Sequence, residues 1–246
     1  MATWTRNRRF RPSLAPTLAV VALLPLLVSL GFWQLDRAGQ KRTLQTAFAA
    51  GSEAVVDPVA TELPTLPRYQ QVVLRGRFDT QHQFLLDNMT DGGAAGYQVL
   101  TPFRPEGWDA SIIVNRGWVK KDFTRPELPV VEVDELPREL SGRLAPLPRP
   151  GISLVSAPQT EASWPRVVQF PQMEELAQSL GQTLVARSIL LDADAADGYL
   201  RRWQPVELGP ERHIGYAVQW FALAATLLII YLLVNLKRID NDGQHG

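Results

Sequence analysis

The chain has 246 residues, its 25 Lys and Arg are balanced by 25 Asp and Glu, and it contains no cysteine. The neutral balance excludes the basic surplus that is typical of nucleic-acid-binding domains. The lack of cysteine excludes disulfides, Cys-ligated zinc, iron–sulfur clusters and a thiol nucleophile, and it disfavours copper delivery because soft sulfur ligands suit Cu(I).

The first predicted element is a membrane helix over residues 14–33, LAPTLAVVALLPLLVSLGFW. This stretch has about the ~20 apolar residues that a helix needs to cross the hydrocarbon core. Pro16 and Pro25 are compatible with it, because membrane helices tolerate proline. A cleavable signal peptide is the alternative, with AFA at residues 47–49 as its cleavage site. Charged residues separate that site from the apolar stretch, so the spacing favours a retained anchor.

The middle of the chain predicts a β-rich domain. Residues 34–51 continue the first helix as far as Gly51. β-branched and aromatic stretches bounded by turn residues predict strands at residues 72–78, 97–103, 111–119, 138–144 and 183–193. A turn is expected at residues 87–93, DNMTDGG, and one helix at residues 171–180. Because no βαβ rhythm is present, we expect an antiparallel sheet or a partly open barrel.

A second membrane helix is predicted over residues 214–236. Both spans have basic residues at their outer ends: Arg6, Arg8, Arg9, Arg11, Lys237 and Arg238. The positive-inside rule then predicts that both termini are cytoplasmic. We expect a multi-pass α+β membrane protein with a β-rich extracytoplasmic domain, in a periplasm or an equivalent space, between the two spans. Its parts are a basic tail (1–13), a span (14–33), a periplasmic β-rich domain (34–213), a second span (214–236) and a cytoplasmic tail (237–246).

The sequence contains no recognisable catalytic set. His82, His213 and His245 are its histidines. No pattern brings a serine, a histidine and an acid together, and neither a glycine-rich phosphate loop nor an HExxH motif is present. These observations predict that the protein is not an enzyme.

His213 is the histidine with a chemical context. Gly209 and Pro210 predict a helix start just before it, and the positive end of a helix disfavours a protonated imidazole. Neutral imidazole is the form that binds haem iron. One stripe of the helix is formed by His213, Tyr216, Ala217 and Trp220. The stripe fits a porphyrin site, and it equally fits the aromatic belt of a membrane interface.

Arg116 and Trp118 form the most unusual pair in the middle segment. Period-two alternation predicts that both lie on one face of a strand, with Asn115 on the other. An arginine can stack on tryptophan or bind a carboxylate with two parallel hydrogen bonds. The pair is therefore either packing at a strand end or part of a docking face.

Four sequence blocks together resemble the Surfeit locus protein 1 family, assembly factors for cytochrome c oxidase. The blocks are LGFWQLDRAGQK (30–41), FLLDNMTDGGAAGYQVLTPF (84–103), IIVNRGWV (112–119) and HIGYAVQWFAL (213–223). The resemblance implies a non-enzymatic assembly factor that binds haem a and aids its insertion into the oxidase catalytic subunit. It also implies His213 as iron ligand and functional roles for Trp220 and the pair Gly117-Trp118. Met89 and Gln40 depart from the family pattern.

On this interpretation the haem site lies between the two membrane helices. His213, Tyr216 and Trp220 form one wall, and Trp33 and Arg37 form the other, with Arg37 paired to a haem propionate. The expected partners are the oxidase catalytic subunit and the haem a synthesis machinery. The alternative function is a membrane-tethered docking module or chaperone without a cofactor. Such a module would place Arg116, Trp118 and Trp33 on its contact faces.

Overall fold

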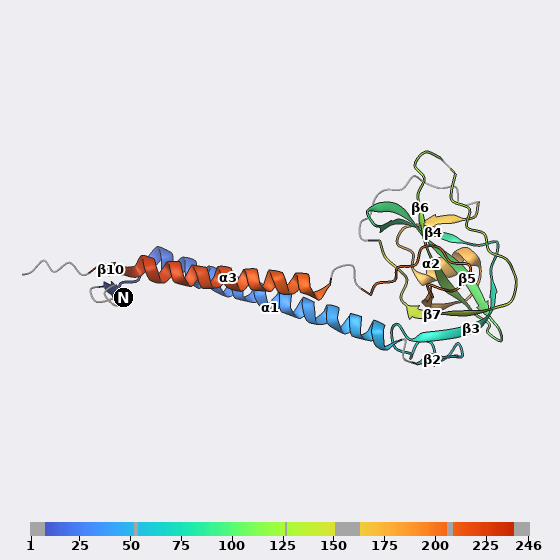
Figure 1. The fold of residues 1–246 in the computed structure, drawn as a ribbon, viewed down its shortest axis with the longest axis horizontal. Helices are drawn as coiled ribbons and strands as arrows, with labels where there is room; N and C mark the ends of the chain where they lie inside the picture. The colour runs from blue at the N-terminus through green and yellow to red at the C-terminus, as the bar shows by residue number, and fades with distance from the viewer. Residues whose placement is uncertain (1–7, 52–53, 126, 151–162, 206–208, 239–246) are drawn as a thin grey trace, which may run out of the picture. The chain divides into compact units, whose positions relative to one another are not determined.

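The computed structural model describes residues 8–51, 54–125, 127–150, 163–205 and 209–238. The chain divides into two compact units. A helical unit is formed by the two ends of the chain, up to Gln45 and from Val206 onward, and a β-rich unit spans Thr46–Pro205. Figure 1 shows both units, which are described separately below.

Two long apolar helices dominate the helical unit. α1 spans Leu14–Ala50 and α3 spans Pro210–Asn235. Both are long and apolar enough to cross a membrane, and only 11% of the most apolar window of each is buried. A core helix of a soluble protein would be mostly covered, so this exposure fits lipid contact. The two helices predicted from the sequence, one before and one after the β-rich segment of the chain, are thus confirmed.

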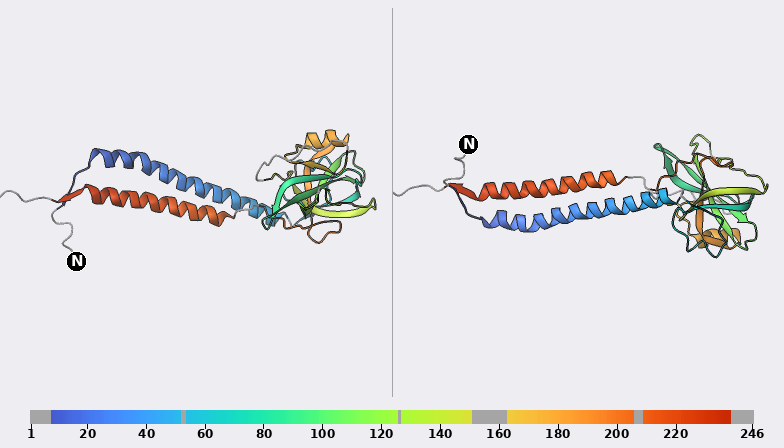
Figure 2. Two further views of the ribbon diagram at one scale, coloured as in Figure 1. Left: turned by 90° about the horizontal axis from the view of Figure 1, so that it is seen from above. Right: turned by 60° about the horizontal axis from the view of Figure 1, so that its bottom comes forward.

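α1 and α3 run antiparallel and side by side in both views of Figure 2. Their shared face carries small buried residues, Gly31 and Ala38 on α1 and Ala217 and Ala224 on α3. A Cβ atom at Gly31 would lie 2.5 Å from the ring of Phe221. Small residues let two membrane helices approach closely, where packing rather than the hydrophobic effect holds them together.

Asn235 ties the end of α3 to the start of α1. Its side chain is fully buried. Oδ1 accepts a hydrogen bond from the backbone N–H of Ser13 at 2.7 Å, and Nδ2 donates to the carbonyl of Tyr231 at 2.8 Å. The Tyr231 hydroxyl lies 3.0 Å from Oγ1 of Thr17 on α1. These contacts satisfy buried polar groups and fix the axial register of the two helices.

A short two-stranded ribbon extends this end of the helical unit. β1 (Arg8–Phe10) pairs antiparallel with β10 (Leu236–Arg238). The ring of Phe10 meets the ring of Tyr231 edge-on, with centroids 5.8 Å apart. The sequence did not predict this ribbon, because its strands are three residues each and pair across the whole length of the chain.

The described residues of the β-rich unit form eight strands and the helix α2, besides the last turn of α1. They are β2 (Val55–Val56), β3 (Gln71–Phe78), β4 (Phe84–Asp91), β5 (Ala94–Pro105), β6 (Ser111–Lys120), β7 (Arg138–Ala145), β8 (Arg166–Val168), α2 (Met173–Leu180) and β9 (Leu184–Leu191). The sheet order is β2-β3-β7-β9-β6-β5-β4-β8, and an additional β3–β5 pairing closes five strands into a barrel. The pairs β6–β9, β2–β3 and β4–β8 are parallel. The predicted β-rich, partly barrel-like domain is confirmed.

The barrel encloses the main core and α2 covers a second one. Residues of β3, β5, β6, β7 and β9 pack together in the first cluster, which includes Phe78, Phe103, Ile112, Leu140 and Ile189. Leu176 of α2 packs on residues from β4, β5 and β6. Gln172 and Glu175 form a capping box at the start of α2, and Gly181 ends the helix in the left-handed conformation, as expected for a helix stop.

All five predicted strands are present, but the predicted turn at residues 87–93 was wrong. β4 continues to Asp91, and only Gly92 and Gly93 form the turn, with φ of 56° and 82°. Two successive positive φ angles match the two-residue turns that suit a twisted hairpin. The sequence did not predict β4, because Phe84, Leu85 and Leu86 are all buried and do not alternate.

The last turn of α1 belongs to the β-rich unit. The ring of Phe48 meets Tyr69 edge-on with centroids 5.0 Å apart. The guanidinium of Arg143 lies 4.0 Å from the same ring and donates to the Phe48 carbonyl at 2.7 Å. Residues 47–49, the alternative cleavage site, therefore lie within a segment that the folded unit uses, which favours a retained first helix.

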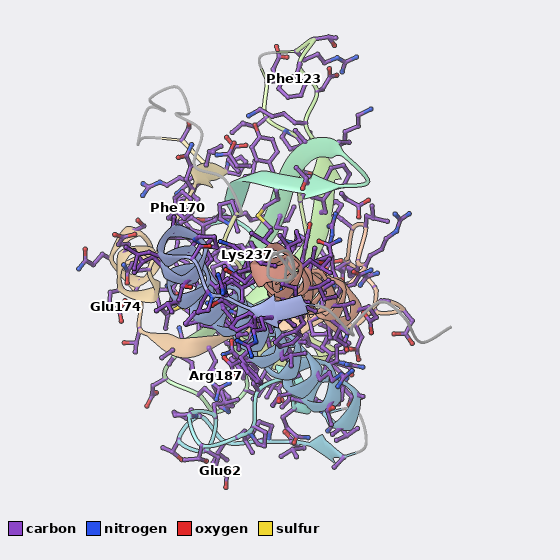
Figure 3. All side chains as sticks on the ribbon, turned by 90° about the vertical axis from the view of Figure 1, so that its left-hand side faces the viewer. Glu62, Phe123, Phe170, Glu174, Arg187 and Lys237 are labelled. Atoms are coloured by element: carbon purple, nitrogen blue, oxygen red, sulfur yellow. The ribbon has the colours of Figure 1, made fainter. Side chains whose placement is uncertain are left out.

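The connections between strands carry apolar side chains that face outward. Phe123, in the connection after β6, is 77% exposed. Figure 3 shows Phe123 and Glu62 at opposite ends of the β-rich unit. Isolated exposed apolar residues are common on folded proteins, and Phe123 is not part of the buried core of the unit.

Replacing Asn235 with alanine tests the hydrogen bonds by which Asn235 joins the end of α3 to the start of α1. Asn235→Ala removes both side-chain hydrogen bonds, and we expect it to lower the free energy of unfolding by about 1–2 kcal/mol. The measurement is the midpoint of denaturant-induced helix loss in detergent. Thr226→Ala is the control, since it removes one exposed bond to Ala222 within α3. Equal midpoints for the two variants would contradict a special role for Asn235.

Candidate functional site

His213 is held by α1 across the helix interface. It lies in the first turn of α3, after the N-cap residue Gly209. Its Nδ1 lies 2.8 Å from Oε1 of Gln34. A carboxamide oxygen only accepts hydrogen bonds, so Nδ1–H donates this bond, and in the neutral tautomer with this proton Nε2 keeps a lone pair. A hydrogen bond of this kind commonly orients a metal-ligating imidazole.

The expected aromatic stripe on α3 is partly present. Ala217 is buried against α1, and Trp220 is half-buried on the same side of α3 as His213. Tyr216 is 45% exposed and lies at the edge of the interface. Nothing in the described part of the chain hydrogen-bonds to Nε2 of His213. The imidazole and one tryptophan are therefore the α3 groups best placed to meet a flat ligand.

On α1, Trp33 and Arg37 form a stacked pair beside Gln34. The Arg37 guanidinium lies 5.7 Å from the Trp33 ring centroid, and Arg37 also donates to Oε1 of Gln40 at 2.9 Å. Trp33 is 50% exposed. None of the contacts made by Arg37 with described residues reaches His213, so a joint role of these two residues stays a prediction.

His213 is not part of a protein-built metal cluster. Within the described ranges no group of three or more His, Cys, Asp or Glu side chains could hold a metal ion. Any metal bound through His213 would therefore need further ligands that come with it, as a porphyrin provides for iron.

Arg116 lies inside the barrel end, where its side chain is 2% exposed. Three backbone carbonyls accept its hydrogen bonds, those of Asp197 at 2.7 Å, Val131 at 2.9 Å and Glu132 at 3.1 Å. The guanidinium also lies 5.1 Å from the Tyr199 ring centroid. Burial lowers the pKa of Arg116 from its ordinary value, while Tyr199 acts to raise it. Arginine keeps its charge under such shifts, so Arg116 is a buried cation whose charge is stabilised by hydrogen bonds to backbone carbonyls.

Arg116 and Trp118 do not share a face, and that prediction was wrong. The β5–β6 register pairs Gln98 with Trp118 but Leu100 with Asn115, so β6 carries one extra residue there. Directly paired residues share a face, which puts Asn115 and Trp118 on one side and Arg116 on the other. Gly117 forms the bulge with a φ of 112°. A docking surface that includes Arg116 is incompatible with its burial, whereas a contact role for half-buried Trp118 stays a prediction.

The sequence profile of the SURF1 family matches residues 21–225. The chain belongs to the SURF1 family. The match covers part of α1, the whole β-rich unit and the first half of α3, so it includes Gln34, Arg116 and His213.

Individual relatives are similar over most of this chain. A SURF1-like protein of Rickettsia felis is 25% identical over 88% of this chain and 95% of its own length. Surfeit locus protein 1 of Takifugu rubripes is 26% identical over 85% of this chain and 92% of its own length. The cytochrome oxidase assembly protein SHY1 of Saccharomyces cerevisiae is 25% identical over 76% of this chain and 49% of its own length.

Residues 84–103, the second of the four sequence blocks that resemble the family, contribute a carboxylate to a buried ion pair. Sequence reasoning did not predict this pair. Asp87 on β4 is almost fully buried, and Nζ of Lys121 lies 3.2 and 3.3 Å from its two carboxylate oxygens. The same ammonium lies 4.9 Å from the Tyr97 ring centroid. Burial acts to lower the pKa of Lys121, but hydrogen bonds to Tyr97 and Asp87 outweigh it and raise that pKa. The pair joins the end of β6 to β4, and we assign it a structural role.

Arg116→Met tests whether Arg116 is structural. Methionine has a similar stem but leaves the carbonyls of Val131, Glu132 and Asp197 without their donor. We expect a loss of about 3 kcal/mol or more in the free energy of unfolding, measured by urea denaturation of the full chain in detergent. The control is Arg77→Gln, at an exposed arginine on β3. A variant of Arg116 as stable as the control would contradict the assignment.

Proposed function

We propose that this protein is a non-enzymatic, membrane-anchored assembly factor for cytochrome c oxidase that binds haem a through His213. The observation that carries the haem part is the hydrogen bond from His213 Nδ1 to Gln34 Oε1 at 2.8 Å. This contact orients the ring, and in the neutral imidazole, the form that ligates haem iron, it would leave the Nε2 lone pair available to the metal.

Family membership supports the assembly role. The yeast relative is named as a cytochrome oxidase assembly protein, and that role is what we propose for this chain. The oxidase catalytic subunit is the proposed recipient, and the haem a synthesis machinery is the proposed source. Haem a supplies the iron on which the chemistry of the mature oxidase depends, so this chain needs to hold the cofactor and to release it.

The residues around His213 fit a flat, dicarboxylate cofactor. Nε2 of His213 would take the iron, and Gln34 would hold the ring in place. Trp220 and Tyr216 offer aromatic faces on α3. Arg37, which contacts Gln40 and the Trp33 ring within the described chain, would pair with a propionate. A histidine in an apolar helix pair is costly to retain without a function, which adds weight to this assignment.

We propose a bacterial inner-membrane location with both termini cytoplasmic and the β-rich unit periplasmic. The support is the pair of apolar helices α1 and α3, together with basic residues at their outer ends. These include Arg9 and Arg11 before α1 and Lys237 after α3. Such residues stay on the cytoplasmic side during insertion.

His213→Ala should abolish the haem that co-purifies with the protein. Gln34→Ala should weaken haem retention by about 10–100-fold, because it removes the group that orients the ligand. The measurement is haem content per chain from the visible absorption of purified protein. His82→Gln is the matched control, since His82 lies in the β-rich unit with Nδ1 held by Asp79 at 2.8 Å. Full haem content in His213→Ala would remove His213 as the ligand.

A deletion strain tests the assembly role separately from haem binding. Membranes lacking this protein should lose the a-type haem signal of the oxidase in optical difference spectra, and the intact gene should restore it. Restoration by the His213→Ala gene would keep the assembly role but reject the haem site. An unchanged signal in the deletion strain, with no second copy of the gene in the host, would contradict the assembly role itself.

A further inference from the structure

The β-rich unit contains an open cleft of about 600 Å³. It lies on the outside of the barrel, against β9, the segment after β7 and the start of α2. Its walls include Tyr69, Trp203, Leu190 and Met173, and its polar groups include Gln98 and two arginines. Cavities of this size, apolar with a few converging polar groups, are typical of small-molecule sites.

The described residues that line the cleft carry positive charge only. Arg68 and Arg149 both line it and both are exposed. Neither forms an ion pair with a described residue, and no Asp or Glu occurs among the described residues that line the cleft. Two guanidinium groups without an acidic partner among the described residues favour an anionic ligand, because arginine binds carboxylates with paired, charge-assisted hydrogen bonds.

A free amide donor lies in the wall of the cleft. Oε1 of Gln98 accepts a hydrogen bond from Nδ2 of Asn115 at 2.8 Å, and Oδ1 of Asn115 accepts from the N–H of Gly117 at 3.1 Å. These contacts fix the orientation of both carboxamides. The amide nitrogen of Gln98 has no acceptor within the described chain, and its two N–H groups remain available to a ligand.

Two aromatic side chains form rigid walls. Tyr69 adopts a φ of 68°, which is uncommon for a bulky residue. Its ring is held between Phe48, with centroids 5.0 Å apart, and the Arg68 guanidinium at 4.7 Å. Nε1 of Trp203 donates to the carbonyl of Leu191 at 2.6 Å, which fixes the indole. Because these two side chains are already ordered, binding a ligand between them costs less side-chain conformational entropy.

We propose that this cleft binds a small amphipathic carboxylate. Arg68 and Arg149 hold its carboxylate, Gln98 adds a neutral donor, and Tyr69 and Trp203 cover its apolar body. A fatty acid and the propionate edge of a porphyrin share this chemistry. His213 is not among the residues that line the cleft, and the proposal does not depend on haem ligation there.

The test compares acids with neutral analogues on the full chain carrying His213→Ala. Metal-free protoporphyrin and its dimethyl ester form one pair of probes, and phenylbutyrate and phenylbutanol form the other. Binding is measured by equilibrium dialysis, with protein-free detergent micelles as the blank. We expect at least one acid to bind about tenfold or more tightly than its neutral analogue. Tighter binding of the porphyrin acid points to a haem-derived ligand, and tighter binding of phenylbutyrate points to a fatty acid.

The double variant Arg68→Gln, Arg149→Gln should lose this preference for the acid, while the control Arg77→Gln should keep it. Circular dichroism confirms that each variant is folded. Equal binding of acids and neutral analogues, or an equal loss in the Arg77→Gln control, would overturn the proposal. So would the absence of binding by both acids. Because all probes lack iron and His213 is already replaced, iron ligation contributes to none of these outcomes, and the double variant separates binding in the cleft from any pairing of a propionate with Arg37.

Discussion

The antiparallel register of α1 and α3 is the constraint on which the candidate site depends. Lipid gives two apolar helices no hydrophobic reason to associate, so close packing and buried polar contacts must set their alignment. Gly31 and Ala217 allow the close approach, and Asn235 fixes one end of the pair. The other end then brings His213 opposite Gln34. A shift of one helical turn would separate these two side chains and leave the imidazole without its orienting partner.

In the β-rich unit, the buried cation Arg116 is the interaction that holds separate segments in place. Arg116 gathers carbonyls from the connection after β6 and from the segment after β9. It therefore closes one end of the barrel with hydrogen bonds where apolar side chains alone would leave those carbonyls unsatisfied. The bulge at Gly117 is part of this arrangement, because it turns Arg116 inward while Trp118 stays half-buried on the other face.

Periodicity and apolar length were enough to predict the two helices, five strands and a β-rich barrel. They were not enough for β4, whose first residues are buried on both faces, or for β8, which has three residues and pairs with β4. Helix-start signals drew attention to His213, but its partner Gln34 is 179 residues away in sequence and follows only from packing. The faces of Arg116 and Trp118 depend on one inserted residue, which period-two reasoning does not reveal.

Composition and geometry together narrow the kind of cofactor this fold could hold. The chain has no cysteine, and the described residues offer no cluster of carboxylates and imidazoles for a bare metal ion. A cofactor that brings its own metal ligands asks much less of the protein, namely one imidazole and apolar surface. In the site proposed above, His213 would provide the imidazole and the α1–α3 pair the apolar surface. Release of the cofactor would then depend on few protein contacts, which suits the carrier role that we propose.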